Sequence, residues 1–76
     1  MKRSKEHRFV ICIRNDDYPA SLETRKLYES LPDDEAAKHD QIRVIDESGE
    51  DYLYPASYFV AVDLPKATER VLVHTT

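Results

Sequence analysis

The chain has 76 residues, of which 41% are hydrophobic and 34% charged, and its formal net charge is -4. This length and balance indicate one small folded domain and exclude a second core or a largely disordered chain. No apolar run approaches the ~18 residues that span a bilayer, no signal-peptide pattern follows the charged start, and Cys12 is the only cysteine, so we expect a cytoplasmic protein without disulfides.

The charges are unevenly distributed along the chain. Residues 1–8 sum to +3 and predict a flexible basic arm, whereas residues 9–76, the predicted single domain, sum to -7. A body of that sign repels a phosphate backbone, because nucleic-acid binding depends on Lys and Arg that displace condensed counterions. This disfavours nucleic acid as a partner, although the basic arm could still touch it.

The first predicted strand is RFVICIRN at 8–15, where apolar and β-branched residues occupy both alternating faces. A loop follows at 16–24, because aspartates and Pro19 favour irregular backbone. RKLYES at 25–30 predicts a second strand, with a helix over 21–31 as the alternative on loosely spaced leucines. The segment 31–40 is polar and predicts one helical turn, capped by Asp33 or Asp34.

A hairpin is predicted next. QIRVIDES at 41–48 predicts a strand with Ile42 and Val44 on one face, and DYLYP at 51–55 predicts the returning strand, which Pro55 ends. Gly49 is the only glycine and stands between them, so we expect it to supply the positive φ of the turn.

The remaining segments predict a tight corner, a last strand and a helix. ASYF at 56–59 suits one helical turn, and VAVDLP at 60–65 predicts a strand with Val60, Val62 and Leu64 on one face. Pro65 begins a short C-terminal helix, with Asp63 as a candidate cap. Five short strands, one hairpin and one corner predict a mainly β domain closed into a small barrel or roll.

The segment YLYPASYFVAV at 52–62 resembles the end of Src homology 3 domains, in which an aromatic strand runs into a proline, two small residues, a tyrosine and a last strand. The stretch 9–72 is also similar to a group of small bacterial proteins that share RVIDESGEDYLYP-type sequences. The resemblance implies a five-stranded Src homology 3-like barrel.

In peptide-binding Src homology 3 domains the matching proline and tyrosine line a groove for proline-rich ligands. The resemblance therefore implies that Pro55 and Tyr58 line a groove, with Tyr18 of the first long loop beside them. The chain departs from the family in having no tryptophan, and IRNDDYP is only an acidic, aromatic counterpart of the family's Ala-Leu-Tyr-Asp-Tyr motif.

The tyrosines are the main candidate binding residues. Tyr52 and Tyr54 alternate with Leu53, so we expect them to share a face opposite Leu53. Aromatic rings with a polar tip suit binding surfaces, because they offer a large area at low entropic cost. The alternative is that the tyrosines close a small core that lacks tryptophan.

Metal binding and catalysis find little support. The carboxylates around Gly49 do not match an EF-hand loop, which needs glycine sixth and glutamate twelfth, and a solvated turn is the favoured interpretation. The histidines lack the spacing of a metal site or a triad, and Cys12 in an apolar strand is typical of an inert thiol. We expect no metal, no cofactor and no enzymatic activity.

Three functional hypotheses follow. The first is a non-enzymatic module, monomeric or weakly dimeric, that binds a protein or peptide through Tyr18, Tyr54, Pro55 and Tyr58, with acidic loops selecting basic partners. The second is a nucleic-acid or ribonucleoprotein accessory domain, which needs Arg25, Lys26, Arg43 and the arm on one face. The third is small-molecule binding or catalysis in an enclosed pocket.

Overall fold

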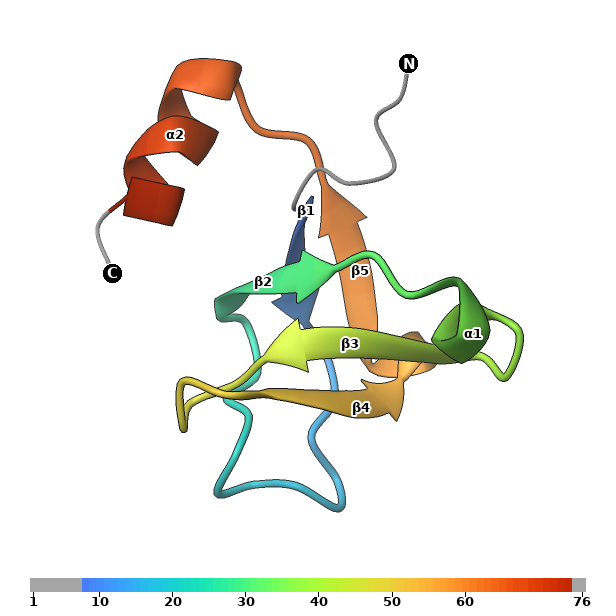
Figure 1. Ribbon diagram of the computed structural model, residues 1–76. Helices are drawn as coiled ribbons and strands as arrows, with labels where there is room; N and C mark the ends of the chain where they lie inside the picture. Colours follow the sequence, from blue (N-terminus) through green and yellow to red (C-terminus); the bar gives the residue numbers. More distant parts are fainter. Residues whose placement is uncertain (1–7, 75–76) are drawn as a thin grey trace.

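Five short strands form one antiparallel sheet in the computed structural model, which describes residues 8–74 (Figure 1). They are β1 (Arg8–Cys12), β2 (Leu27–Leu31), β3 (Gln41–Ile45), β4 (Asp51–Pro55) and β5 (Phe59–Val62), in the order β4-β3-β2-β1-β5. The mainly β prediction is therefore confirmed. Because β4 and β5 are the two ends of that order, the sheet is not closed, and the predicted barrel is not confirmed.

Short helical segments connect or follow the strands. They are α1 (Asp34–Ala37), the 3-10 turn η1 (Ala56–Tyr58) and α2 (Lys66–His74). These confirm the predicted turn in the polar connection, the tight corner and the C-terminal helix. None of the described helices is long and apolar enough to cross a membrane. The basic arm predicted for residues 1–8 lies outside the described residues, except for Arg8, which begins β1.

Local signals account for the element boundaries. Asp33 caps α1, since its carboxylate accepts a hydrogen bond of 2.9 Å from the Ala36 backbone amide. Gly49 has φ +87°, and its amide donates to the Asp46 carbonyl at 2.9 Å, as the hairpin prediction requires. The helix alternative for 21–31 is wrong, because β2 buries every second residue and so follows the period of a strand.

One face of the sheet carries the core. The strand register places Val10 opposite Tyr28, and Cys12 opposite Phe59, on this face. Val44 of β3 and Tyr54 of β4 belong to the same core, and all six side chains are buried. Leu22 joins them from outside the sheet and is fully buried. An aromatic-rich core of this kind matches a small domain without tryptophan.

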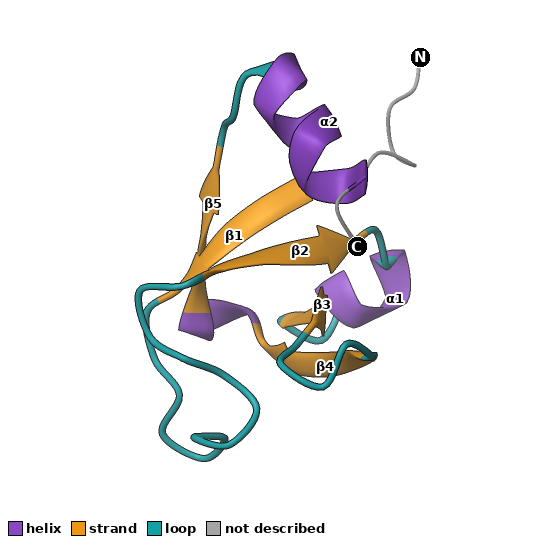
Figure 2. Cartoon of the chain, turned by 90° about the vertical axis from the view of Figure 1, so that its left-hand side faces the viewer, coloured by secondary structure: helices purple, strands orange, loops and turns teal. Residues whose placement is uncertain are grey.

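The long loop, residues 13–26, connects β1 to β2 and extends past the sheet at the end opposite α2 (Figure 2). Leu22 anchors it in the core, and the Asn15 side chain donates to the Leu22 carbonyl at 2.8 Å. The Glu47 amide donates to the Ser21 carbonyl at 3.1 Å, which joins the loop to the β3–β4 hairpin. Loop and hairpin therefore lie together beside β4.

Candidate functional site

An open pocket of about 360 Å³ lies where the long loop meets the β3–β4 hairpin and β4. We call it the tyrosine pocket. It is lined by three tyrosines, two serines, one leucine and one carboxylate, namely Tyr18, Ser21, Asp46, Ser48, Tyr52, Leu53 and Tyr54. Its walls come from two segments that are distant in the sequence, residues 18–21 of the long loop and residues 46–54 of the hairpin, so only the tertiary fold assembles it.

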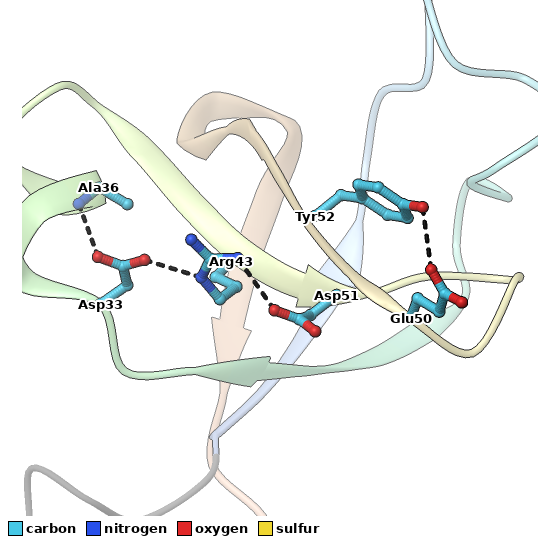
Figure 3. A network of polar contacts seen from close by, with 6 residues as sticks. All are labelled: Asp33, Ala36, Arg43, Glu50, Asp51 and Tyr52. Atoms are coloured by element: carbon cyan, nitrogen blue, oxygen red, sulfur yellow. Dashed lines mark hydrogen bonds and ion pairs between the residues drawn. The ribbon is translucent and has the colours of Figure 1, made fainter.

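The three tyrosines play different parts in the wall. Tyr18 and Tyr52 are 37% and 49% exposed, whereas Tyr54 is 3% exposed and belongs to the core. The edge of one ring meets the face of the other between Tyr18 and Tyr54, with centroids 4.9 Å apart. Tyr52 donates to Glu50 at 3.1 Å, which orients its exposed ring (Figure 3). The rings of Tyr18 and Tyr52 are thus partly exposed to solvent, and Tyr18 packs against the buried ring of Tyr54.

Asp46 supplies the pocket's buried carboxylate. It is 6% exposed, and it accepts hydrogen bonds from the Ser48 amide at 2.9 Å, the Ser48 hydroxyl at 2.6 Å and the Tyr54 hydroxyl at 2.5 Å. Burial raises the pKa of Asp46, but the hydrogen bonds from Ser48 and Tyr54 outweigh burial and hold that pKa below its ordinary value. The carboxylate is therefore ionised at neutral pH and acts as a fixed negative charge.

Tyr54 is the matching donor. Burial, together with the hydrogen bond to Asp46, raises the pKa of Tyr54 to about 12, while a hydrogen bond with Ser21 opposes the rise. The phenol accordingly keeps its proton at neutral pH. A protonated phenol next to an ionised carboxylate holds the pocket in one arrangement and offers no group poised to transfer a proton.

The predicted site residues are only partly brought together. Tyr18 and Tyr54 line the pocket, and Tyr58 lies next to it, with its ring centroid 6.1 Å from that of Tyr18. Tyr58 is 6% exposed, so it and Tyr54 belong to the core, as the alternative interpretation held. Pro55 is half-buried and lies outside this pocket. A binding role for the four residues stays a prediction.

Apart from Tyr52, which was considered beside Tyr54, the other pocket residues were not predicted as part of a site. Tyr52 shares the core face of β4 with Tyr54, as predicted. Leu53 was expected to lie apart from them on the opposite face of the strand, but it also lines the pocket. The solvated-turn interpretation is wrong for Asp46, which is buried. The Asp-x-Ser spacing of Asp46 and Ser48 was the available signal, because aspartate at the start of a turn commonly bonds the backbone two residues on.

The basic residues of the nucleic-acid hypothesis are largely engaged within the chain. Lys26 Nζ lies 2.6 Å from the Glu47 carboxylate. Arg43 bridges Asp33 at 2.8 Å and Asp51 at 2.9 Å, linking the start of α1 to the hairpin strands (Figure 3). Opposite charges at these distances neutralise the cations locally, which weakens any attraction for phosphate.

Residues that could support metal or covalent chemistry are not gathered in this site. Among residues 8–74, no group of three or more His, Cys, Asp or Glu side chains could hold a metal ion. Cys12 is fully buried, and this burial raises the pKa of its thiol, which disfavours the nucleophilic thiolate.

No protein-family model, curated protein or solved structure matches the chain. The resemblance to Src homology 3 domains and to small bacterial proteins therefore stays a prediction.

Proposed function

We propose that the protein is a small non-enzymatic interaction module that binds a segment of a partner protein at the tyrosine pocket. The observation that carries the proposal is the pair of exposed rings, Tyr18 and Tyr52, which line an open pocket together with Tyr54 and an ionised carboxylate. Aromatic side chains with polar tips dominate the binding energy of many interfaces. An open pocket of this size suits one or two side chains of a peptide.

The strand arrangement supports a Src homology 3-like fold as part of this proposal. β1 pairs with both β2 and β5, and the 3-10 turn Ala56–Tyr58 leads directly into β5. The proposed binding surface differs from the one implied by the resemblance, since it involves the hairpin and Tyr52 and leaves Pro55 outside.

The state of the ionisable groups favours binding over catalysis. Asp46 is ionised and Tyr54 is protonated at neutral pH, and each is already paired with the other. General acid–base catalysis instead requires a group whose pKa lies near the working pH. A permanently charged, rigid wall is suited to recognition.

The proposal is tested by selecting peptides from a random display library on the wild-type protein and measuring their affinity by calorimetry. A Tyr18→Ser, Tyr52→Ser double variant removes both exposed rings but leaves the core tyrosines in place. We expect it to bind the selected peptides at least about tenfold more weakly, because each exposed aromatic ring at an interface contributes on the order of 1 kcal/mol or more.

Val60→Ser is the matched control. Val60 is 49% exposed on β5, at the other edge of the sheet, so this change alters an exposed apolar side chain remote from the pocket. It should bind like wild type. The proposal fails if no peptide is enriched, or if the double variant remains folded by circular dichroism and binds as tightly as wild type.

A further inference from the structure

Two core tyrosines, Tyr28 and Tyr58, each form a hydrogen bond with a carboxylate and also have a basic side chain of the same chain over the ring. Tyr28 donates to Glu47 at 2.6 Å. The ammonium of Lys26 lies 2.6 Å from that carboxylate and 5.7 Å from the centroid of the Tyr28 ring. The Lys26 ammonium thus forms an ion pair with Glu47 and a cation–π contact with the Tyr28 ring.

Tyr58 repeats this arrangement on the long loop. Its hydroxyl lies 3.4 Å from Asp17, and the Arg14 guanidinium is centred 5.4 Å from its ring centroid. Arg14 also pairs with Asp16, the neighbouring carboxylate. Here too an acidic group, a tyrosine ring and a basic side chain are assembled together.

The pair of Tyr54 and Asp46 lacks the third component. Within residues 8–74, no Lys or Arg forms an ion pair with Asp46, and none is stacked over the rings of Tyr18, Tyr52 or Tyr54. Yet Asp46 is the most deeply buried of the three carboxylates in these pairs. Hydrogen bonds stabilise the Asp46 charge but leave it without a counter-charge, so a cation from outside can form a charge-assisted hydrogen bond there.

Asp46 also retains the capacity to accept a further hydrogen bond. An ionised carboxylate offers about four lone-pair sites. Two donors, both from Ser48, bond to Oδ1, whereas Tyr54 alone bonds to Oδ2. One N–H from a ligand can therefore be accepted at Oδ2 without displacing a bond of the fold.

We propose that the tyrosine pocket binds a basic side chain, arginine or lysine, of the partner segment. Its cation donates one N–H to Asp46 and lies against the exposed rings of Tyr18 and Tyr52. This inference rests on the proposed function and specifies the chemistry recognised by the same pocket. In this proposal Asp46 of the β3–β4 hairpin selects a positively charged side chain, and the tyrosines that line the pocket with it contact that side chain.

The test is a titration of the isotope-labelled protein with N-acetyl-arginine amide and N-acetyl-citrulline amide, followed by NMR. Citrulline has nearly the same shape as arginine but no charge. We expect the arginine ligand to shift the amides of Ser48, Tyr52 and Leu53 and to bind at least about tenfold more tightly than the citrulline ligand. The corresponding lysine amide should also bind.

Three variants place the effect in the pocket. Asp46→Asn and Tyr52→Ala should each weaken arginine binding at least about fivefold, since one removes the charge and the other a ring. Asp51→Asn is the matched control, because it removes one charge from the same hairpin outside the pocket lining, where Asp51 pairs with Arg43. It should change the affinity by less than about twofold at moderate salt, where exposed charges are screened. Tyr52 is exposed, so its variant remains informative if Asp46→Asn does not fold.

Three outcomes would overturn the inference. The first is equal binding of the arginine and citrulline ligands to wild type, which needs no variant to interpret. The second is an equal loss of affinity in Asp51→Asn and Asp46→Asn, which would assign the effect to the general field of the hairpin. The third is a set of selected peptides that bind at the pocket without a basic residue, in which case the interaction function stands and this inference alone falls.

Discussion

At the scale of single residues, the bond between Tyr54 and Asp46 links the core to the candidate site. Both side chains are almost completely buried. Burial is the largest influence on the pKa of each, and the hydrogen bond between them lowers the pKa of Asp46 and raises that of Tyr54. Removal of a donor from a buried carboxylate leaves part of its charge unsatisfied, which costs more than an exposed hydrogen bond contributes. The same two residues therefore link the stability of the fold to the recognition proposed for the pocket.

Tyr54→Phe is expected to destabilise the fold by about 1–3 kcal/mol, because it removes a hydrogen bond to a buried charge while keeping the ring. Urea unfolding followed by circular dichroism measures the change. Tyr52→Phe is the matched control, because its exposed hydroxyl bonds the exposed Glu50, and it should unfold near the wild-type midpoint. Equal midpoints for both variants would show that the buried bond contributes no more than the exposed one.

At the scale of the elements, the long loop and the hairpin support each other. The loop has no regular strand or helix, yet Leu22 is fully buried and the Ser21 carbonyl accepts from Glu47 of the hairpin. Tyr28 adds a second connection, since its hydroxyl accepts from the Glu23 amide at 2.7 Å and donates to Glu47. The position of Tyr18 in the pocket depends on these anchors.

Leu22→Ala should cost about 2–5 kcal/mol, the range for a leucine truncated in a packed core, and it should loosen the long loop first. Urea unfolding measures the free energy, and amide hydrogen exchange shows which segment opens. Val60→Ala, at an exposed position of β5, should stay within about 0.5 kcal/mol of wild type. A Leu22 variant as stable as Val60→Ala would contradict the anchoring role.

Gly49→Ala should destabilise the hairpin by about 1–2 kcal/mol, because a residue with a Cβ is strained at positive φ. Beyond Gly49 and its two chain neighbours, no heavy atom lies within 4 Å of the position that a Cβ would occupy, so the cost is one of backbone conformation and not of overlap with packed neighbours. Gly49→Asn should cost less, since asparagine tolerates this region better. Thermal unfolding of the two variants distinguishes backbone strain from a general effect of adding a side chain.

At the scale of the whole molecule, acidic groups with lowered pKa values stabilise the fold above acidic pH. Asp46 has its pKa lowered because hydrogen bonds outweigh burial, and the pKa of Glu47 is lowered chiefly by Lys26 and then by Tyr28. A carboxylate whose pKa is lower in the folded state contributes stability above its unfolded value, and this contribution is lost as the pH falls. Both groups lie where the long loop meets the hairpin.

We therefore expect the unfolding free energy to be nearly constant at neutral pH and to fall below about pH 4, the ordinary range of carboxyl groups. Asp46→Asn should show a shallower fall than wild type, because asparagine does not titrate. Urea midpoints measured at neutral and acidic pH give both slopes. A slope for Asp46→Asn identical to that of wild type would contradict a stabilising role of its charge.

The sequence by itself determined most of the local structure. The strands, the capped turn at α1, the hairpin at Gly49 and the corner at 56–58 follow patterns that act over a few residues, such as alternation, side-chain capping and positive φ. Tyr18 and Tyr54 were also identified as candidate binding residues. Nothing in these patterns reported which tyrosines are buried.

Only the tertiary structure decided the composition of the site. Tyr18 and Tyr54 are far apart in the chain, and their contact depends on how the long loop folds back against β4. The burial of Asp46 likewise depends on the neighbours that enclose it, whereas its sequence context is that of an exposed turn. Closure of the sheet is also a global property, set by the pairing of its edge strands, and here the edges β4 and β5 remain unpaired with each other. Local patterns specify which elements form, but the packing of distant segments determines which side chains meet.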